Sequence, residues 1–414
     1  MISILTAALC VLAITIGWKA WSHRLNPITT GALVWSPAII LATMPREFIS
    51  PIYSHLNHEI GISVFVALIL GFFSFSIGVY LSFLVIGRRS WTEKTNTQFK
   101  INVHEGRLLI LFFLGFSIYL YTIQNAGLVG YLNYSYEEIS ERRIALHSSL
   151  SFLVFFLDIA AIIFFARMLE TGRYLYCMPM LISIVCHMST LQKSPLLFLV
   201  ISIVYLCLIY SRQALVMLIG TARKKLVIAL SIITLVFSLF IMNSIRGIGV
   251  TPMTTFEWSW YEQIYIYSGA TAILNLSATI EGLIPTHHVA YNLFLFRPIT
   301  WHLLGWKLMD IGQYFHGINT GTYLIYPWVD FQWIGFFITP FLTGAIVVAF
   351  HRLAFKKTVY GIMLGAIAFK ATIFSPLTDV IFDPTTSIMI FFALIAHIFV
   401  VKRVRKPRCC KVDA

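Results

Sequence analysis

Charged residues are scarce in this sequence of 414 amino acids: Asp, Glu, Lys and Arg make up only 11% of it, whereas 58% is hydrophobic. Soluble globular proteins carry about 25% charged residues, so the composition excludes an ordinary water-soluble protein. Several apolar runs reach the roughly 17–25 residues that a helix needs to cross a bilayer. The chain is therefore predicted to be an all-α polytopic membrane protein, with residues 1–414 forming one integral membrane domain.

Hydropathy predicts about eleven transmembrane helices, at roughly 1–18, 28–44, 60–86, 108–126, 149–166, 175–191, 195–210, 226–243, 331–350, 359–377 and 385–401. Most of the 30 Lys and Arg residues fall in alternate connections between these segments and in the basic tail at 402–414. Because cytoplasmic loops are enriched in Lys and Arg, those connections and the C-terminus are predicted to be cytoplasmic. The basic residues of the tail are interpreted as a signal that sets the membrane topology or as a contact with anionic membrane lipids. Nucleic-acid binding is not expected.

Motifs for metal, nucleotide and serine-nucleophile chemistry are also lacking. The sequence has no H-E-x-x-H, no Cys pair with metal-ligand spacing, no P-loop and no G-x-S-x-G elbow. The six cysteines lie in predicted spans or in the tail, so no disulfide framework is implied. We therefore predict no metal and no cofactor, and we expect the cytoplasmic face to be non-catalytic.

Two longer segments are predicted on the outer side of the membrane, at 127–148 and at about 244–330. The second is by far the longest connection, and structureless loops beyond about 12–15 residues are usually functional or contain further structure. Its portion at 260–282, WYEQIYIYSGATAILNLSATIEG, is amphipathic. We expect a helix there that lies in the interface, re-enters the bilayer or crosses it.

A few basic residues remain on the outer side, against the positive-inside rule: Arg46, Arg142, Arg143, Lys193, Arg246, Arg297 and Lys307. Each alone is typical of a snorkelling anchor or a salt-bridge partner. Five of them come from separate outer segments and turns, namely Arg142, Arg143, Lys193, Arg246 and Arg297. We predict that these five converge over one cavity and hold a pyrophosphate, for which Arg offers bidentate contacts.

Two charged residues, Asp158 and Lys370, fall inside predicted spans. Charge within the hydrocarbon layer is costly, so such residues usually face the bundle interior and pair with one another. We expect Asp158 to pair with Lys370. The alternative is a proton or substrate pathway, as in transporters.

The stretch NTGTYLIYPWVDFQWIG, residues 319–335, places an amide, hydroxyls, phenols and a carboxylate before an apolar run. It resembles the motif of Wzy-type O-antigen polymerases, which carry an Asn/Thr patch, then Asp-Phe-Gly and another Gly leading into a span. Asp330, Phe331 and Gly335 fit this motif, while Gln332 stands where the motif has its first Gly. The turn LQKSPLL and the segment IYIYSGATAILN also resemble the family.

The resemblance implies a GT-C-like glycosyltransferase in the bacterial inner membrane, with its active site on the periplasmic side. It would transfer the growing glycan from undecaprenyl diphosphate to the next lipid-linked repeat unit. Its partners would be that undecaprenyl-diphosphate-linked oligosaccharide, a chain-length-regulating co-polymerase and a flippase.

Roles for individual residues follow from this reaction. Cations near the leaving diphosphate would stabilise its charge as it develops, and a general base would assist the acceptor hydroxyl. We assign the first role to Arg246 and Arg297, supported by Lys193 and Arg142, and the second to His316 or Asp330, followed by Glu262. The predicted sugar contacts are Tyr265, Asn319, Thr322, Tyr323 and Trp328.

Two other functions fit the same architecture. An O-antigen ligase would share the plan but transfer glycan to the lipid A core. A polysaccharide flippase or secondary transporter would share the intramembrane charges. Transporters are often built from inverted repeats with paired broken helices, and neither is visible in this sequence.

Overall fold

The computed structural model of the chain describes residues 26–43, 60–86, 101–125, 151–189, 193–210, 269–282, 322–376 and 380–401. Within these ranges the regular structure is helical, apart from one isolated β-bridge between Val103 and Val401. The helices are α2 (Pro27–Ala42), α3 (Ile62–Ile86), α5 (Glu105–Asn125), α7 (Phe155–Thr171), α8 (Met178–Ser189), α9 (Lys193–Ile209), α13 (Ala270–Ile280), α15 (Ile325–Phe331), α16 (Gly335–Phe355), α17 (Val359–Phe374) and α18 (Pro384–Val400). Short 3₁₀ turns, η4 (Ser151–Val154), η5 (Tyr174–Cys177) and η7 (Gln332–Ile334), precede α7, α8 and α16.

Four helical stretches are long and apolar enough to cross a membrane: Ile62–Ile86, Glu105–Asn125, Phe152–Thr171 and Ile325–Phe355. Shorter apolar helices accompany them, and together they indicate a membrane protein, as predicted. Helices are present in nine of the eleven predicted spans. The spans predicted near 1–18 and 226–243, and the basic tail at 402–414, lie outside the described residues.

Local sequence explains where several helices begin. Asn26 caps α2, its side-chain oxygen accepting from the backbone N–H of Ile28 at 3.0 Å, and Pro27 follows at the first helical position. Asp383 caps α18 in the same way, accepting from Thr386 N–H at 3.2 Å. Such caps satisfy backbone donors that a helix leaves unpaired in its first turn.

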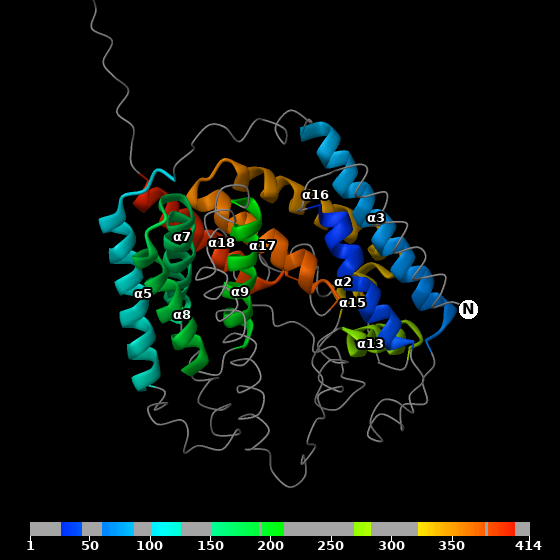
Figure 1. Ribbon diagram of the computed structural model, residues 1–414. Helices are drawn as coiled ribbons and strands as arrows, with labels where there is room; N and C mark the ends of the chain where they lie inside the picture. The colour runs from blue at the N-terminus through cyan, green and yellow to red at the C-terminus, as the bar shows by residue number, and fades with distance from the viewer. Residues whose placement is uncertain are drawn as a thin grey trace, which may run out of the picture.

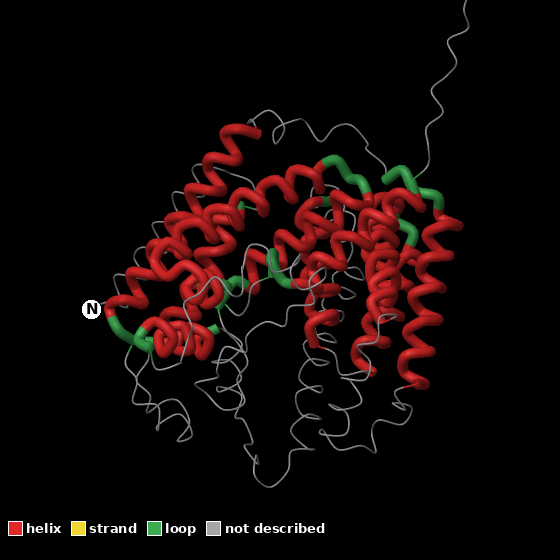
Figure 2. Tube along the Cα trace, turned by 180° about the vertical axis from the view of Figure 1, so that it is seen from behind, coloured by secondary structure: helices red, strands yellow, loops and turns green. Residues whose placement is uncertain are grey.

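The helices form two groups joined by a central pair (Figure 1). In one group α7 contacts α5, α8, α9 and α18, and in the other α13 contacts α2, α3 and α15. The central helix α17 contacts α9 and α18 on one side and α2 on the other, and its neighbour α16 packs along α3. Viewed from behind, the two groups again lie on opposite sides (Figure 2).

Glycines allow α3 and α16 to approach closely. A Cβ atom at Gly78 would overlap the carbonyl oxygen of Phe341, and one at Gly344 would overlap that of Phe75. The hydroxyl of Ser74 donates to the carbonyl oxygen of Phe337 across the same contact at 2.5 Å. Small residues and hydrogen bonds of this kind hold helices together where lipid removes the hydrophobic drive.

The two ends of the bundle can be named by their contents. The Glu170 end holds the start of α5, the end of α7, the end of α16 and Val401, and lies at the top of Figure 1. The α13 end lies opposite, with α13 and the start of α9. The helix ends and turns that carry Arg107, Arg167, Arg173, Arg352 and Lys357 all lie at the Glu170 end.

Candidate functional site

The polar stretch before α16 folds as a buried turn on the side of the bundle that contains α2 and α13. Thr322 is fully buried, and its hydroxyl oxygen accepts from Leu324 N–H at 3.2 Å. The backbone N–H of Tyr323 donates to the carbonyl oxygen of Ser375 at the end of α17. Its ring meets that of Trp35 edge to face, with 6.0 Å between centroids. These contacts fix the start of α15 against α2 and α17.

Between α15 and α16 the backbone makes a sharp turn at Gln332, which has φ 51° and ψ −134°. This is a left-handed conformation that favours glycine and costs other residues about 1–3 kcal/mol. Gly335 then lies so close to α15 that a Cβ atom there would overlap the carbonyl oxygen of Pro327. The motif position where this chain carries Gln in place of Gly thus still has the glycine-type conformation.

The residues of α15 are buried by aromatic packing. Trp328 is 7% exposed and stacks on Phe336, with ring centroids 5.4 Å apart, while Trp333 meets both rings at steep angles. Asp330, one residue from the end of α15, is 8% exposed. A carboxylate so placed is held away from bulk water. Its electrostatic interactions are stronger there than they would be in water.

Helix α13 brings further polar groups to this region. All ten residues from Ala270 to Thr279 are buried, and they include Thr271, Asn275, Ser277 and Thr279. The hydroxyl of Thr271 makes no hydrogen bond within the described part of the chain. At the start of α13, Gly269 has φ 92°, and a Cβ atom there would come within 2.7 Å of the Cβ atom of Pro376. We call Asp330, Thr322, Tyr323 and the polar residues of α13 the α13-side polar cluster.

Most predicted site residues fall outside the described residues: Arg142, Arg246, Glu262, Tyr265, Arg297, His316 and Asn319. Lys193 is the first residue of α9, and only its backbone is described. The structure places Thr322 and Tyr323 just before α15 and Trp328 and Asp330 on α15, and all four are buried. Their roles in substrate binding and catalysis stay predictions.

The expected pair between Asp158 and Lys370 is wrong. Asp158, on α7, is 1% exposed, and its Oδ1 accepts from the hydroxyl of Ser183 at 2.6 Å and lies 2.7 Å from Nε2 of His187. Both partners come from α8, which packs beside α7. A buried carboxylate is stable only when paired and hydrogen-bonded, and these two neighbours provide this.

Lys370 instead points toward α9. Its Nζ lies 5.4 Å from the ring centroid of Phe198, and among the described residues it forms no ion pair. A cation–π contact contributes about 0.5–2 kcal/mol, whereas a Lys at the centre of a membrane helix costs about 2.5–3.5 kcal/mol. The contact with the ring of Phe198 therefore does not fully offset the free-energy cost of placing the Lys370 charge in the bundle.

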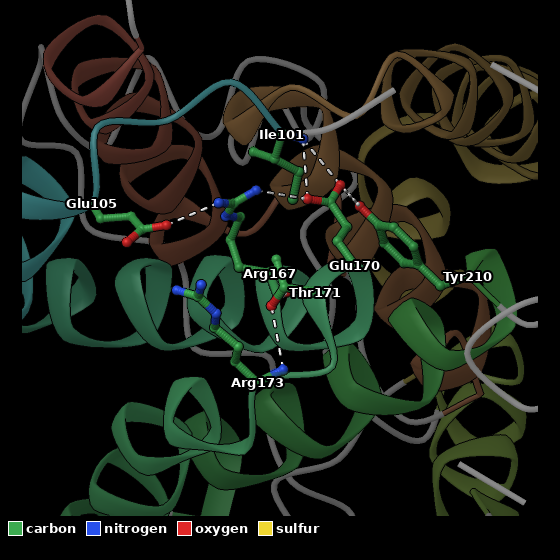
Figure 3. A network of polar contacts seen from close by, with 7 residues as sticks. All are labelled: Ile101, Glu105, Arg167, Glu170, Thr171, Arg173 and Tyr210. Carbon is green, nitrogen blue, oxygen red and sulfur yellow. Dashed lines mark hydrogen bonds and ion pairs between the residues drawn. The ribbon is translucent and has the colours of Figure 1, made fainter. Parts of the chain in front are cut away.

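At the Glu170 end, by contrast, charges form a connected network (Figure 3). Arg167 lies between Glu105, at 2.9 Å, and Glu170, at 3.2 Å. Glu170 also accepts from Ile101 N–H at 3.0 Å and from the hydroxyl of Tyr210 at 3.2 Å. Lys357 extends the network, because its Nζ lies 4.7 Å from the ring centroid of Tyr210. Burial lowers the pKa of Lys357, and the charge of Glu170 opposes that change.

Sequence reasoning missed His187 and Ser183 as partners of Asp158, and it missed the polar face of α13 as part of the site. His187 lies at an apolar helix end, so neither spacing nor composition signals its partner. Among the described residues no group of three His, Cys, Asp or Glu side chains could hold a metal ion. Comparison with models of known families, with curated proteins and with solved structures found no match.

Proposed function

We propose that this protein is a Wzy-type polymerase of undecaprenyl-diphosphate-linked repeat units, with the α13 end facing the periplasm. The observation that carries the proposal is the α13-side polar cluster. The residues that resemble the polymerase motif fold as a buried turn with Asp330 inside it, against the hydroxyl-rich helix α13. Hydroxyls, amides and a carboxylate at this depth provide hydrogen-bonding groups for a saccharide at the membrane surface.

The reaction moves a glycan between two lipid carriers. A hydroxyl of the acceptor sugar attacks the anomeric carbon of the donor, the bond from that carbon to the diphosphate oxygen breaks, and undecaprenyl diphosphate leaves. The proton of the acceptor hydroxyl passes to a general base, for which we propose Asp330 or His316. Arg246 and Arg297 stabilise the negative charge of the departing diphosphate.

Because both substrates are lipid-linked, binding them at one depth of the bilayer supplies much of the rate advantage. The proposed reaction requires no nucleotide. The basic residues at the Glu170 end, including Arg107, Arg173 and Arg352, support the orientation with that end in the cytoplasm.

A gene deletion tests the function directly. We expect lipopolysaccharide of the deletion strain to carry a single repeat unit, because flipping and ligation continue while polymerisation stops. Lipopolysaccharide with no repeat unit at all would point to a ligase or a flippase instead. A normal ladder of chain lengths in the deletion strain would reject all three functions.

The arginine assignment is tested in the complemented strain. We expect Arg246→Ala to abolish the ladder while the protein remains at wild-type level in the membrane, since loss of one transition-state charge contact lowers rates by about 10²–10³-fold. Arg352→Ala is the matched control, because Arg352 lies on the part of α16 at the Glu170 end, and it should leave the ladder unchanged. A full ladder from Arg246→Ala would remove this residue from the mechanism.

A proton-coupled transporter is the second candidate, favoured by the buried pair of Asp158 and His187. Ionisable pairs inside membrane helices often form proton pathways. Under this alternative, Asp158→Asn would stop delivery of repeat units, and no repeat unit would reach lipopolysaccharide. Under the polymerase proposal, that variant retains at least the single-unit product.

A further inference from the structure

Lys370 is a cation whose counter-charge is not supplied by the described residues. It lies in the part of α17 nearest the α13 end, four residues before the helix ends at Phe374. The carboxylate of Asp158 is occupied by Ser183 and His187, so it does not serve Lys370. The charge of Asp383 acts on Lys370 from the start of α18, but that carboxylate already caps α18 through Thr386 N–H.

The surroundings of Lys370 are firmly held. On one side its Nζ lies against the ring of Phe198, which is 1% exposed. Five residues further along α17, Ser375 accepts from Nε1 of Trp35 at 2.8 Å and donates to the carbonyl oxygen of Thr372 at 2.9 Å. The end of α17 is thereby fixed to α2. In addition, the backbone carbonyl oxygen of Ser375 accepts from Tyr323 N–H. Lys370 therefore belongs to a helix end that also positions the start of α15.

We propose that Lys370 binds the diphosphate of a polyprenyl lipid, as an anion-binding residue in addition to the predicted arginines. The identity of that lipid as the glycan carrier rests on the proposed function. Lys370 is intermediate in exposure, so part of its side chain is open to contact by a ligand. An ammonium group acts on phosphate as a compact point charge with three donors. The diphosphate of such a lipid supplies the counter-charge that the described residues do not provide.

The test measures binding of undecaprenyl diphosphate to the purified full-length protein in detergent. We expect Lys370→Met to raise the dissociation constant about 10- to 100-fold, because the loss of one charge-assisted hydrogen bond typically weakens binding by that factor. Lys370→Arg keeps the charge and should retain most of the affinity. Lys356→Met is the matched control, because Lys356 is exposed between α16 and α17 at the Glu170 end, and it should bind as the wild type does.

Two further ligands identify what is bound. Undecaprenol lacks the phosphates and should not compete, and phosphatidylglycerol, which carries one phosphate as an ordinary headgroup, should compete weakly. The proposal is overturned if Lys370→Met binds undecaprenyl diphosphate like the wild type, if phosphatidylglycerol competes as well as the diphosphate, or if the wild type does not bind it. A deletion strain with a normal polymer ladder, combined with binding that depends on Lys370, would reject the polymerase function but retain this site.

Discussion

The two ends of the bundle treat charge in opposite ways. At the Glu170 end one carboxylate receives hydrogen bonds from a guanidinium group, a phenol and a backbone N–H. Toward the α13 end the ammonium group of Lys370 has an aromatic ring and the charge of Asp383, a carboxylate already used as a helix cap. A network with all its partners inside the protein stabilises the fold, whereas a charge left incompletely paired is available to a ligand.

The largest effect is expected from removing the carboxylate of Glu170. Its side chain is 7% exposed, so Glu170→Ala removes one of the two carboxylates that pair with Arg167 and the acceptor of Tyr210 and Ile101 N–H, and should lower the free energy of unfolding by about 3–5 kcal/mol. Denaturant titration of the protein in micelles measures this. Glu105→Ala is the matched control, because the Glu105 side chain is 44% exposed to solvent and should cost at most about 1 kcal/mol. Equal losses for both variants would contradict the distinction.

A smaller loss is expected at the buried carboxylate of α7. Asp158→Asn keeps an acceptor oxygen in the place of Oδ1, which both Ser183 and His187 contact, but removes the negative charge beside His187. We expect the free energy of unfolding to fall by about 1–3 kcal/mol. Ser183→Ala removes only the hydroxyl contact and should cost less than Asp158→Asn. A larger loss for Ser183→Ala would mean that the histidine contact contributes little.

Lys370 should respond in the opposite direction. Lys370→Met replaces a poorly compensated charge by an apolar side chain of similar length, so stability should stay within about 1 kcal/mol of the wild type or rise. The same titration measures this effect, and the proposed loss of diphosphate binding supplies the contrast. A loss of several kcal/mol would show that Lys370 belongs to a structural network like that of Glu170.

The smallest effects concern backbone conformation at the two ends of α16. Gln332 and Lys357 have φ values of 51° and 50°, where glycine is favoured. Gln332→Gly should raise the free energy of unfolding by about 0.5–1 kcal/mol, because the substitution relieves strain. Lys357→Gly should raise it less, since it also removes the contact with the ring of Tyr210. Gln332→Ala serves as the control and should give no gain.

Much of the helical plan follows from apolar runs, because a membrane helix must satisfy its own backbone and is long and continuous in sequence. The helices from Pro27 to Ala42 and from Glu105 to Asn125 lie close to their predicted ranges. Contacts between helices were harder to predict. Asp158 pairs with His187 and not with Lys370 because α8 packs beside α7, and no sequence pattern around His187 marks this contact.

The candidate site was predictable only where a motif exists. The motif at 319–335 marks the polar residues before α16, and the structure buries Thr322 and Tyr323 just before α15 and Trp328 and Asp330 on it. The polar groups of α13 were not assigned to it, because the amphipathic pattern of 260–282 does not state which helices surround it. The glycine-type turn at Gln332 is set by the close packing of Gly335 against Pro327. A glutamine at this position of the sequence does not by itself reveal that conformation.

The β-bridge between Val103 and Val401 has a practical consequence. This bridge joins the end of α18 to the segment before α5. Two hydrogen bonds support it, from His104 N–H to the carbonyl oxygen of Val400 and from Arg107 to the carbonyl oxygen of Phe399. A reporter enzyme fused directly after Val401 would thus be attached beside the segment before α5. Its activity would reveal which compartment that whole rim of the molecule faces.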